Sequence, residues 1–261
     1  MNSHDDQVER QFGPLAAAYL KSSVHAEGPD LRALDRKLAR QSSLDALDLG
    51  CGAGHLTFSI APYVRSVTAF DPSDDMLATV AQEASARRIG NICTRRGIAE
   101  NLPFADQSFE LVCTRYSAHH WANLPRALSE MRRVLSSTGR LIIIDVFAPE
   151  LPLLDTHLQT LELLRDPSHV RNYSITEWRT QLARAGFQVT GAETWKLRLE
   201  FDAWVARSRT AADRVAILRS LLDNAPREVR DYLDVEANST FHVNTVMLEA
   251  SPLLPGNPSG D

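Results

Sequence analysis

Short apolar runs alternate with longer amphipathic segments through the first 150 residues of the chain. The runs lie at residues 44–49, 66–70, 91–95, 109–114 and 141–147. The segments between them, such as 72–88 and 122–135, place apolar residues three or four positions apart, as an amphipathic helix does. Strands that alternate with helices predict βαβ units and a parallel sheet, so we expect an α/β fold.

The fifth run differs from the others because it is apolar without alternation. Its residues 141–144 read Leu-Ile-Ile-Ile, which is typical of a central strand that helices cover on both faces. Further along, Ser174 and Glu177 have the spacing of a capping box, and Gly186 is a typical helix stop. They predict a helix over about 175–185 that leads into a strand from Phe187.

The pattern is again helical over about 199–235, and residues 240–248 alternate as a half-buried strand does. We therefore expect a late helical insertion before the closing strand of the sheet. Near the start of the chain, residues 15–20 and 31–39 favour helices, and Gly28-Pro29 between them should end one helix and begin the next. This predicts N-terminal helices ahead of the first strand.

Composition narrows the classes of protein that need to be considered. Of the 261 residues 44% are apolar and 23% are charged, as in soluble globular proteins, and the net charge of −5 argues against a general nucleic-acid binder. Cys51, Cys93 and Cys113 lie far apart, which disfavours a disulfide framework or a zinc site and fits a reducing compartment. The start of the chain lacks the layout of a secretion signal, and no apolar run reaches the ~18 residues of a membrane span. We expect a cytoplasmic protein.

A glycine-rich loop follows the first predicted strand. Gly50, Gly52 and Gly54 occupy alternate positions, and without a Cβ they let the main chain turn sharply and approach a ligand. The dinucleotide pattern G-x-G-x-x-G would place its third glycine at position 55, where this chain has His55, so NAD is disfavoured. A phosphate-binding P-loop is disfavoured too, because no Lys follows Gly54. The alternative is a tight turn without a ligand.

The second predicted strand leads directly into Asp71. A carboxylate at the tip of the strand next to such a loop can accept hydrogen bonds from both hydroxyls of a ribose. Its alternative role is to cap the helix that begins near Ser73. Together with the glycine loop, Asp71 predicts a ligand that carries an intact ribose.

Five segments resemble one family when they are taken together in order. They are LDLGCGAG at 47–54, FDPSDDML at 70–77, GIAENLPF at 97–104, FELVCTRYSAHHW at 109–121 and ALSEMRRVLSSTGRLIIID at 127–145. This combination resembles the class I S-adenosylmethionine-dependent methyltransferases, in the branch similar to the ubiquinone and menaquinone C-methyltransferases (methyltransferase domain 11 type). The resemblance covers about residues 12–147. It implies a three-layer Rossmann-like sheet of seven strands, with helices on both faces and the last strand antiparallel.

The resemblance also implies a cofactor, S-adenosyl-L-methionine, with S-adenosyl-L-homocysteine as its product. Asp48 and the glycine loop would hold the methionine portion, Asp71 the ribose, and Pro72 or Met76 would pack near the adenine. Many relatives carry an acidic residue where this chain has Ile98, so the adenine amine needs another partner here. The cofactor-binding residues implied in this way are Asp48, Gly50, Cys51, Gly52, Gly54, Asp71, Pro72, Met76, Ala99, Glu100 and Arg115.

The implied chemistry is in-line attack of an acceptor on the sulfonium methyl. Alignment of two bound reactants lowers a barrier by on the order of 7 to 11 kcal/mol, and a base is needed only if the accepting atom must lose a proton. His119 and His120 follow the fourth predicted strand and are candidates for a base or for substrate contacts; the alternative is that one caps a helix and the other packs. Tyr19 is a candidate on the N-terminal helix, with plain amphipathic packing as its alternative. No third ligand at motif spacing accompanies the histidines, so we expect no metal.

Tyr116, Arg171 and Tyr173 are candidates for substrate contact. Arg115 and Arg171 could hold a carboxylate of the substrate, although such arginines are more often on the surface or in ion pairs. Cys51 is more typical of close packing than of catalysis, because no cationic neighbour stands beside it. The acceptor is expected to be a small molecule, without nucleic acid as a partner and without a membrane span. The alternative is a non-catalytic S-adenosylmethionine-binding or regulatory protein on the same fold.

These expectations divide the chain into four parts of a single domain. They are an N-terminal helical lid over residues 1–43, a cofactor-binding α/β core over 44–150, the remainder of the sheet with its insertion over 151–250, and a flexible tail over 251–261.

Overall fold

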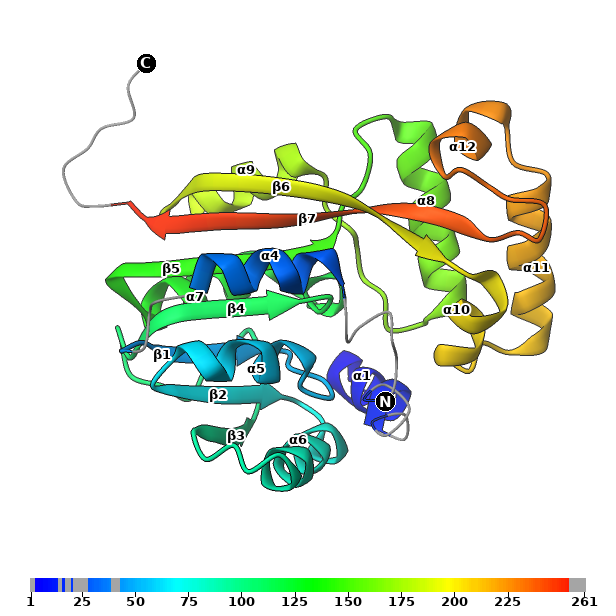
Figure 1. Cartoon of the computed structure of the whole chain (residues 1–261). Helices are drawn as coiled ribbons and strands as arrows, with labels where there is room; N and C mark the ends of the chain where they lie inside the picture. The colour runs from blue at the N-terminus through cyan, green and yellow to red at the C-terminus, as the bar shows by residue number, and fades with distance from the viewer. Residues whose placement is uncertain (1–2, 14–15, 17–19, 21–27, 39–42, 254–261) are drawn as a thin grey trace, which may run out of the picture.

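The computed structural model describes residues 3–13, 16, 20, 28–38 and 43–253 (Figure 1). Within these residues, seven strands form one sheet in the order β3-β2-β1-β4-β5-β7-β6. The strands are β1 (Asp45–Leu49), β2 (Ser66–Asp71), β3 (Ile92–Arg96), β4 (Phe109–Arg115), β5 (Leu135–Val146), β6 (Phe187–Leu199) and β7 (Phe241–Pro252). Strands β1 to β5 pair in parallel, whereas β7 runs antiparallel to both β5 and β6. The predicted α/β class and the antiparallel last strand are confirmed.

The helices lie on both sides of this sheet and beyond its ends. Those described are α1 (His4–Phe12), α4 (Pro29–Leu38), α5 (His55–Ile60), α6 (Asp74–Ala86), α7 (Leu124–Val134), α8 (Pro152–Arg165), α9 (Ile175–Arg184), α10 (Phe201–Arg207), α11 (Ala212–Asp223) and α12 (Arg227–Tyr232), with the short 3-10 turns η2 (Ala61–Tyr63) and η3 (Ala118–His120). Helices α4, α5 and α6 cover one face, and α7 and α9 cover the other. The result is the expected three-layer arrangement.

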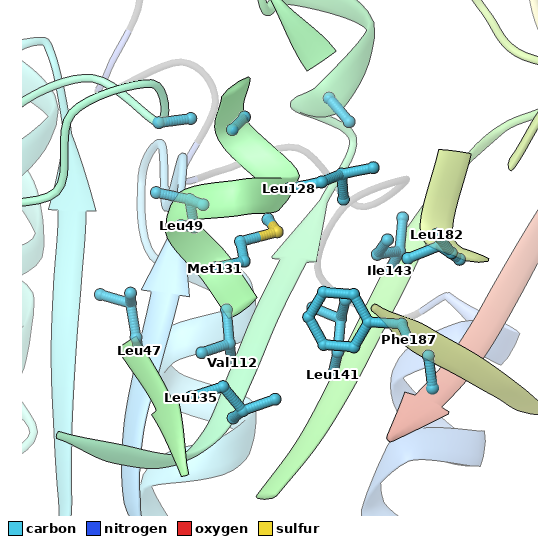
Figure 2. Packing of buried hydrophobic residues seen from close by; sticks show 14 of the residues in the cluster. Leu47, Leu49, Val112, Leu128, Met131, Leu135, Leu141, Ile143, Leu182 and Phe187 are labelled. Atoms are coloured by element: carbon cyan, nitrogen blue, oxygen red, sulfur yellow. The ribbon is translucent and has the colours of Figure 1, made fainter. Parts of the chain in front are cut away.

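The position of β5 between two layers of helices explains why its sequence lacks alternation. Leu141 and Ile143 pack with residues of α7 and α9 on one face of the sheet (Figure 2), whereas Ile142 and Ile144 pack with residues of α4 and α5 on the other. All four side chains are fully buried. Each such side chain contributes about 1.5–3 kcal/mol relative to exposure, so the strand is held from both faces.

The start of β5 differs from the prediction, which placed the strand over 141–147 and a helix up to 135. The helix α7 ends at Val134, and β5 already begins at Leu135. Gly139 lies so close to Leu135 that an added Cβ would come within 2.6 Å of the leucine Cδ1. The polar residues between these two give no strand signal, and their pairing with β4 is irregular.

The capping box before α9 is confirmed. Ser174 Oγ accepts a hydrogen bond from the Glu177 backbone N–H, and the Glu177 carboxylate accepts one from the Ser174 N–H. Gly186, with a φ of 82°, ends this segment in the left-handed region that favours glycine. Strand β6 then starts at Phe187, as predicted.

Beyond the carboxyl ends of the parallel strands, α8, α10, α11 and α12 gather beside the far ends of β6 and β7 (Figure 1). Trp204 packs edge-on against Phe241 with ring centroids 4.9 Å apart, and the Arg219 guanidinium lies 4.2 Å from the Phe201 ring centroid. The predicted late insertion is therefore a small helical layer with its own apolar core. In the described part of the chain, no helix is long and apolar enough to cross a membrane.

Candidate active site

A pocket with a cavity volume of about 210 Å³ opens at the carboxyl ends of the parallel strands. One side is formed by the ends of β1 and β2, with Asp48 and Asp71, and α1 contributes Val8 and Phe12. Ligands of open α/β sheets bind at this edge, because the loops there are free to vary while the strands hold them in place. The far side is formed by the helical layer, from which Trp204 reaches the pocket.

The glycine loop forms the floor of the pocket. Gly50, Gly52 and Gly54 all have positive φ values, of 71°, 50° and 90°. A Cβ on Gly50 would lie 1.9 Å from Ser117 Oγ, whereas one on Gly52 would meet no atom within 4 Å. The main chain at Gly52 is therefore bare on an open side, as a loop that receives a ligand requires. Gly54 does not line the pocket but packs against Phe58 and α6.

Asp71 fastens this loop to the neighbouring strand. Its carboxylate accepts hydrogen bonds of 2.9 Å from the backbone N–H groups of Gly52 and Ser73. Burial raises the pKa of Asp71 to about 6. The two hydrogen bonds favour the charged form and therefore oppose this rise, but burial outweighs them. The capping role belongs to Ser73, whose Oγ accepts from the Met76 N–H at the start of α6. Asp71 lines the pocket and is therefore in place to receive a ribose.

Asp48 lies beneath the loop and also lines the pocket. It is 1% exposed and accepts a 2.5 Å hydrogen bond from Thr57 Oγ1. Burial raises the pKa of Asp48 to about 7. The same burial, together with the charges of Asp71 and Asp48, raises the pKa of the Cys51 thiol, so Cys51 lines the pocket as a neutral, packed side chain.

The residues expected near the adenine also come together. Pro72, Met76, Ile98, Ala99 and Glu100 all line the pocket. The Glu100 carboxylate accepts a 3.0 Å hydrogen bond from the Asn123 N–H, and its backbone oxygen accepts one from Arg126 Nε. Its side chain is therefore engaged in holding the start of α7.

His119 forms an acid–imidazole pair that the sequence did not reveal. Its Nδ1 donates to Asp145 Oδ1 over 2.7 Å, and the same carboxylate accepts from the backbone N–H groups of His119 and Val146. Burial opposes protonation of His119, but the charge of Asp145 and this hydrogen bond outweigh it, so the pKa of His119 is raised. The bond fixes the tautomer, which leaves Nε2 as the nitrogen that can take a proton. His119 lines the pocket with 16% of its side chain exposed.

His120 has a different environment, although it lines the same pocket. Its Nδ1 donates to the Ser168 carbonyl over 3.1 Å, and its ring lies 4.9 Å from the Phe12 ring of α1. Burial, and then the nearby positive charge of His119, lower the pKa of His120 to about 4. This imidazole is therefore neutral and joins the N-terminal helix to the loop that carries Ser168.

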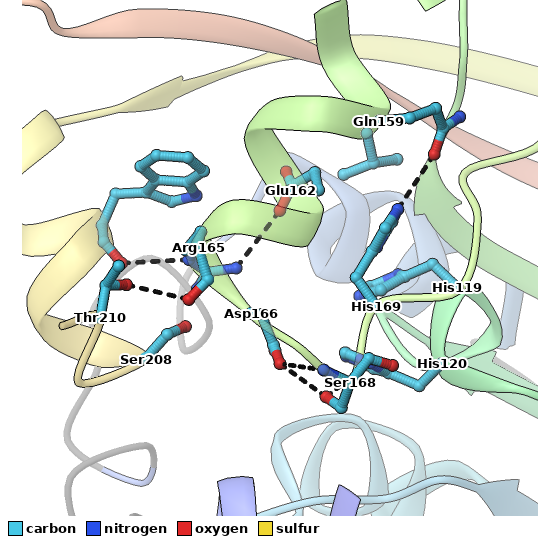
Figure 3. A network of polar contacts seen from close by, with 12 residues as sticks. His119, His120, Gln159, Glu162, Arg165, Asp166, Ser168, His169, Ser208 and Thr210 are labelled. Atoms are coloured by element: carbon cyan, nitrogen blue, oxygen red, sulfur yellow. Dashed lines mark hydrogen bonds and ion pairs between the residues drawn. The ribbon is translucent and has the colours of Figure 1, made fainter. Parts of the chain in front are cut away.

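A polar network supports these histidines (Figure 3). His169 Nε2 donates to Gln159 Oε1, and the Asp166 carboxylate accepts from both the N–H and the Oγ of Ser168. Burial, and then the positive charge of His119, lower the pKa of His169 to about 2. In the part of the chain that the structure describes, no three His, Cys, Asp or Glu side chains are grouped so that they could hold a metal ion.

The expected substrate residues divide into two groups. Tyr116 lines the pocket, with a φ of 51°, and so does Arg115, whose Nε donates to Asp30 Oδ2 over 2.5 Å. Arg171 does not line it: its guanidinium pairs with Asp155 and Glu177 at 3.2 and 3.0 Å.

Tyr173 also lies outside the pocket and packs on Trp178, with ring centroids 5.4 Å apart. Tyr19 lies outside the described residues.

Several pocket residues escaped the sequence analysis. Asp145 had a usable signal, because it lies one residue before the end of the buried strand β5, close to the position that Asp71 has at the end of β2. Others come from the late helical layer and its approach and had no motif: Glu162, Leu197, Trp204 and Arg207.

Known proteins share this architecture over nearly the whole chain. A methyltransferase-domain family matches residues 47–143. The chain is 46% identical to the uncharacterized protein YafE of Escherichia coli K12 over 201 residues, which are 77% of this chain and 97% of that protein. It is 34% identical to the uncharacterized methyltransferase YcgJ of Bacillus subtilis over 242 residues, covering 93% of this chain and 96% of YcgJ.

The crystal structure of YcgJ superimposes with a TM-score of 0.81 at 31% identity, over 86% of this chain and 98% of that one. A demethylmenaquinone methyltransferase of Lactiplantibacillus plantarum is 32% identical over 117 residues, which are 43% of this chain and 49% of that enzyme. The sequence match to YcgJ and the superposition on its structure therefore both extend over most of this chain. The chain belongs to the class I S-adenosylmethionine-dependent methyltransferases.

Proposed function

We propose that this protein transfers a methyl group from S-adenosyl-L-methionine to a small-molecule acceptor by in-line displacement. The observation that carries the proposal is the bare main chain at Gly52, which opens to the pocket and is hydrogen-bonded to Asp71. A nucleoside ligand needs both features, a surface without side chains and a carboxylate for its ribose.

The residues of the pocket fit this cofactor by their chemistry. Asp71 would accept from the ribose hydroxyls, the glycine loop and Asp48 would face the methionine portion, and Pro72, Met76 and Ala99 would pack against the adenine. Asp48 and Asp71 place two carboxylates where a cationic ligand would be stabilised. When bound, S-adenosylmethionine supplies an electrophilic methyl group on a sulfonium and leaves as a neutral thioether.

The chain's own contribution is to position two reactants and to exclude water. The pocket runs without interruption from Asp71 to Trp204, so a cofactor and an acceptor can share it. Alignment of this kind lowers a barrier by on the order of 7 to 11 kcal/mol. We assign His119 Nε2 as the acceptor of a proton, with Asp145 holding the ring, and the neutral His120 as a contact of the substrate.

A small acceptor is favoured because residues of both α1 and the helical layer line the same pocket, whose cavity volume is about 210 Å³. The demethylmenaquinone methyltransferase relative, by its name, also acts on a small molecule. The cysteines Cys51, Cys93 and Cys113 are all free, which fits a reducing compartment, and we place the reaction in the cytoplasm.

Calorimetric titration with S-adenosylmethionine and S-adenosylhomocysteine tests the cofactor assignment. We expect micromolar binding to the wild type and a loss of about tenfold or more in Asp71→Ala, because hydrogen bonds to a charged group contribute about 1.5–3 kcal/mol. Asp231→Ala removes an exposed carboxylate far along the chain and should bind like the wild type. Equal affinity in Asp71→Ala and the wild type would refute the assignment.

A further inference from the structure

The far half of the pocket, beside the helical layer, is lined by different types of residue from the cofactor half, beside the glycine loop. Its apolar wall consists of Val146, Leu197, Leu199, Trp204 and Val243, from β5, β6, β7 and α10. All five wall residues lie beyond the matched family region, which ends at residue 143. The part of the pocket that lies outside the matched region is therefore mainly apolar in this protein.

Glu162, Arg165 and Arg207 are the charged side chains on this side of the pocket, and the first two form an ion pair. The Arg165 guanidinium lies 3.4 Å from the Glu162 carboxylate, and its carbon is 5.2 Å from the Trp204 ring centroid. Arg165 Nε also donates to the Trp204 carbonyl (Figure 3). The Arg165 guanidinium is therefore paired with the Glu162 carboxylate and held against Trp204, so its charge does not need an anionic ligand for balance.

Asn172 supplies an unmatched polar group in the same pocket. It is 2% exposed, lines the pocket, and its Nδ2 has no hydrogen-bond partner within the described residues. The Asn172 backbone is held in place by the Gln159 amide, which accepts a hydrogen bond from the Asn172 N–H over 3.0 Å and donates one to the Asn172 carbonyl over 2.7 Å. A buried N–H without a partner destabilises the protein, and a bound acceptor oxygen would remove that cost.

We propose that this half of the pocket is the methyl-acceptor subsite, and that it takes a largely apolar molecule with an oxygen that accepts a hydrogen bond from Asn172 Nδ2. The inference rests on the proposed function, because it needs the cofactor in the other half. The oxygen is a carbonyl, a hydroxyl or an ether. Its bond to Asn172 fixes the orientation of the acceptor against the Trp204 wall, so Asn172 determines specificity.

Matched probes test the subsite without knowledge of the natural acceptor. Dissociation constants are measured by ligand-observed NMR for 1-indanone, 1-indanol and indane, with the protein saturated with S-adenosylhomocysteine. We expect the better of the two oxygen-bearing probes to bind about tenfold more tightly than indane, which corresponds to about 1.4 kcal/mol. Comparison of 1-indanone with 1-indanol shows whether a carbonyl or a hydroxyl is preferred.

Two variants make the test specific to Asn172. Asn172→Leu keeps the volume and removes the donor, so its preference for oxygen should fall to within about twofold while its S-adenosylhomocysteine affinity stays that of the wild type. Asn224→Leu removes an exposed amide that is bonded to Ser220 and should keep the full preference. Asn172→Asp replaces the donor with an acceptor and should lose the preference for 1-indanone over indane, because a carbonyl oxygen cannot donate to a carboxylate.

The proposal is overturned if the wild type binds indane as tightly as both oxygen-bearing probes, or binds none of them. It is also overturned if Asn172→Leu keeps the preference for an oxygen-bearing probe, or if Asn172→Asp still binds 1-indanone more tightly than indane. A failure of the proposed function itself would give a different result from a failure of the subsite proposal. In that case the wild type does not bind S-adenosylhomocysteine, whatever the probes do.

Discussion

Asp48 is expected to destabilise the folded protein at neutral and alkaline pH. Burial raises its pKa from an ordinary value of 3.8 to about 7. Because the folded pKa lies above the unfolded one, the stability associated with Asp48 is fully present below pH 3.8 and is lost as the pH rises to about 7. At about 1.4 kcal/mol per pKa unit, this shift of about three units amounts to about 4 kcal/mol at pH 8 and about 2 kcal/mol at pH 5.

Asp48→Asn removes this cost. The amide oxygen can still accept the hydrogen bond from Thr57 Oγ1, so the packing is preserved. We expect this substitution to raise the free energy of unfolding by up to about 4 kcal/mol at pH 8 and by roughly half as much at pH 5. Urea unfolding followed by tryptophan fluorescence at the two pH values measures both differences.

Asp231→Asn serves as the control, because this carboxylate is 73% exposed and its change should stay within about 0.5 kcal/mol at either pH. Asp48→Asn should also bind S-adenosylmethionine more weakly, since it removes a negative charge from the pocket. A carboxylate retained at a cost in stability is typical of a functional site. A variant that is less stable than the wild type at pH 8, or whose gain is the same at pH 5 and pH 8, would refute the reasoning.

Three further predictions concern the other residues of the site. Gly52→Val should fold with some loss of stability, because the added Cβ meets no atom within 4 Å but valine strains the left-handed backbone at a φ of 50°, and the distorted loop should no longer bind S-adenosylhomocysteine in calorimetry. Gly50→Val should lose more stability, because its Cβ also collides with Ser117. Unchanged affinity in Gly52→Val would contradict the loop assignment. Asp145→Asn should lower the pKa of His119, because the charge that raises it is gone, and NMR titration of the imidazole resonances would disprove this by showing no change. Arg171→Gln should lose no more than about 1 kcal/mol of stability and keep its cofactor affinity, since its ion pairs lie outside the pocket; weaker calorimetric binding would speak against that placement.

The cofactor half of the site could be predicted from the sequence because it depends on local features. The three glycines set the shape of the loop by their positive φ values, and Asp71 follows a strand that the apolar pattern locates. Asp145 has a similar position, one residue before the end of β5. The rule that found Asp71, a polar residue at the carboxyl end of a buried parallel strand, would have found it too.

The acceptor half could not be predicted in this way, because it depends on distant pairings. Whether Arg171 faces a substrate or an ion pair is decided by Asp155 and Glu177, which come from two different helices. Asn172 is held in the pocket by Gln159 on α8. No short pattern in the sequence contains either relation.

The central claim is that the loop at Gly52 and the carboxylate of Asp71 together receive a nucleoside. A crystal structure of the protein with S-adenosylhomocysteine tests it most directly. The account predicts both ribose hydroxyls within hydrogen-bonding distance of Asp71 and the homocysteine portion against the main chain of Gly52. A ligand bound elsewhere, or a ribose turned away from Asp71, would contradict it.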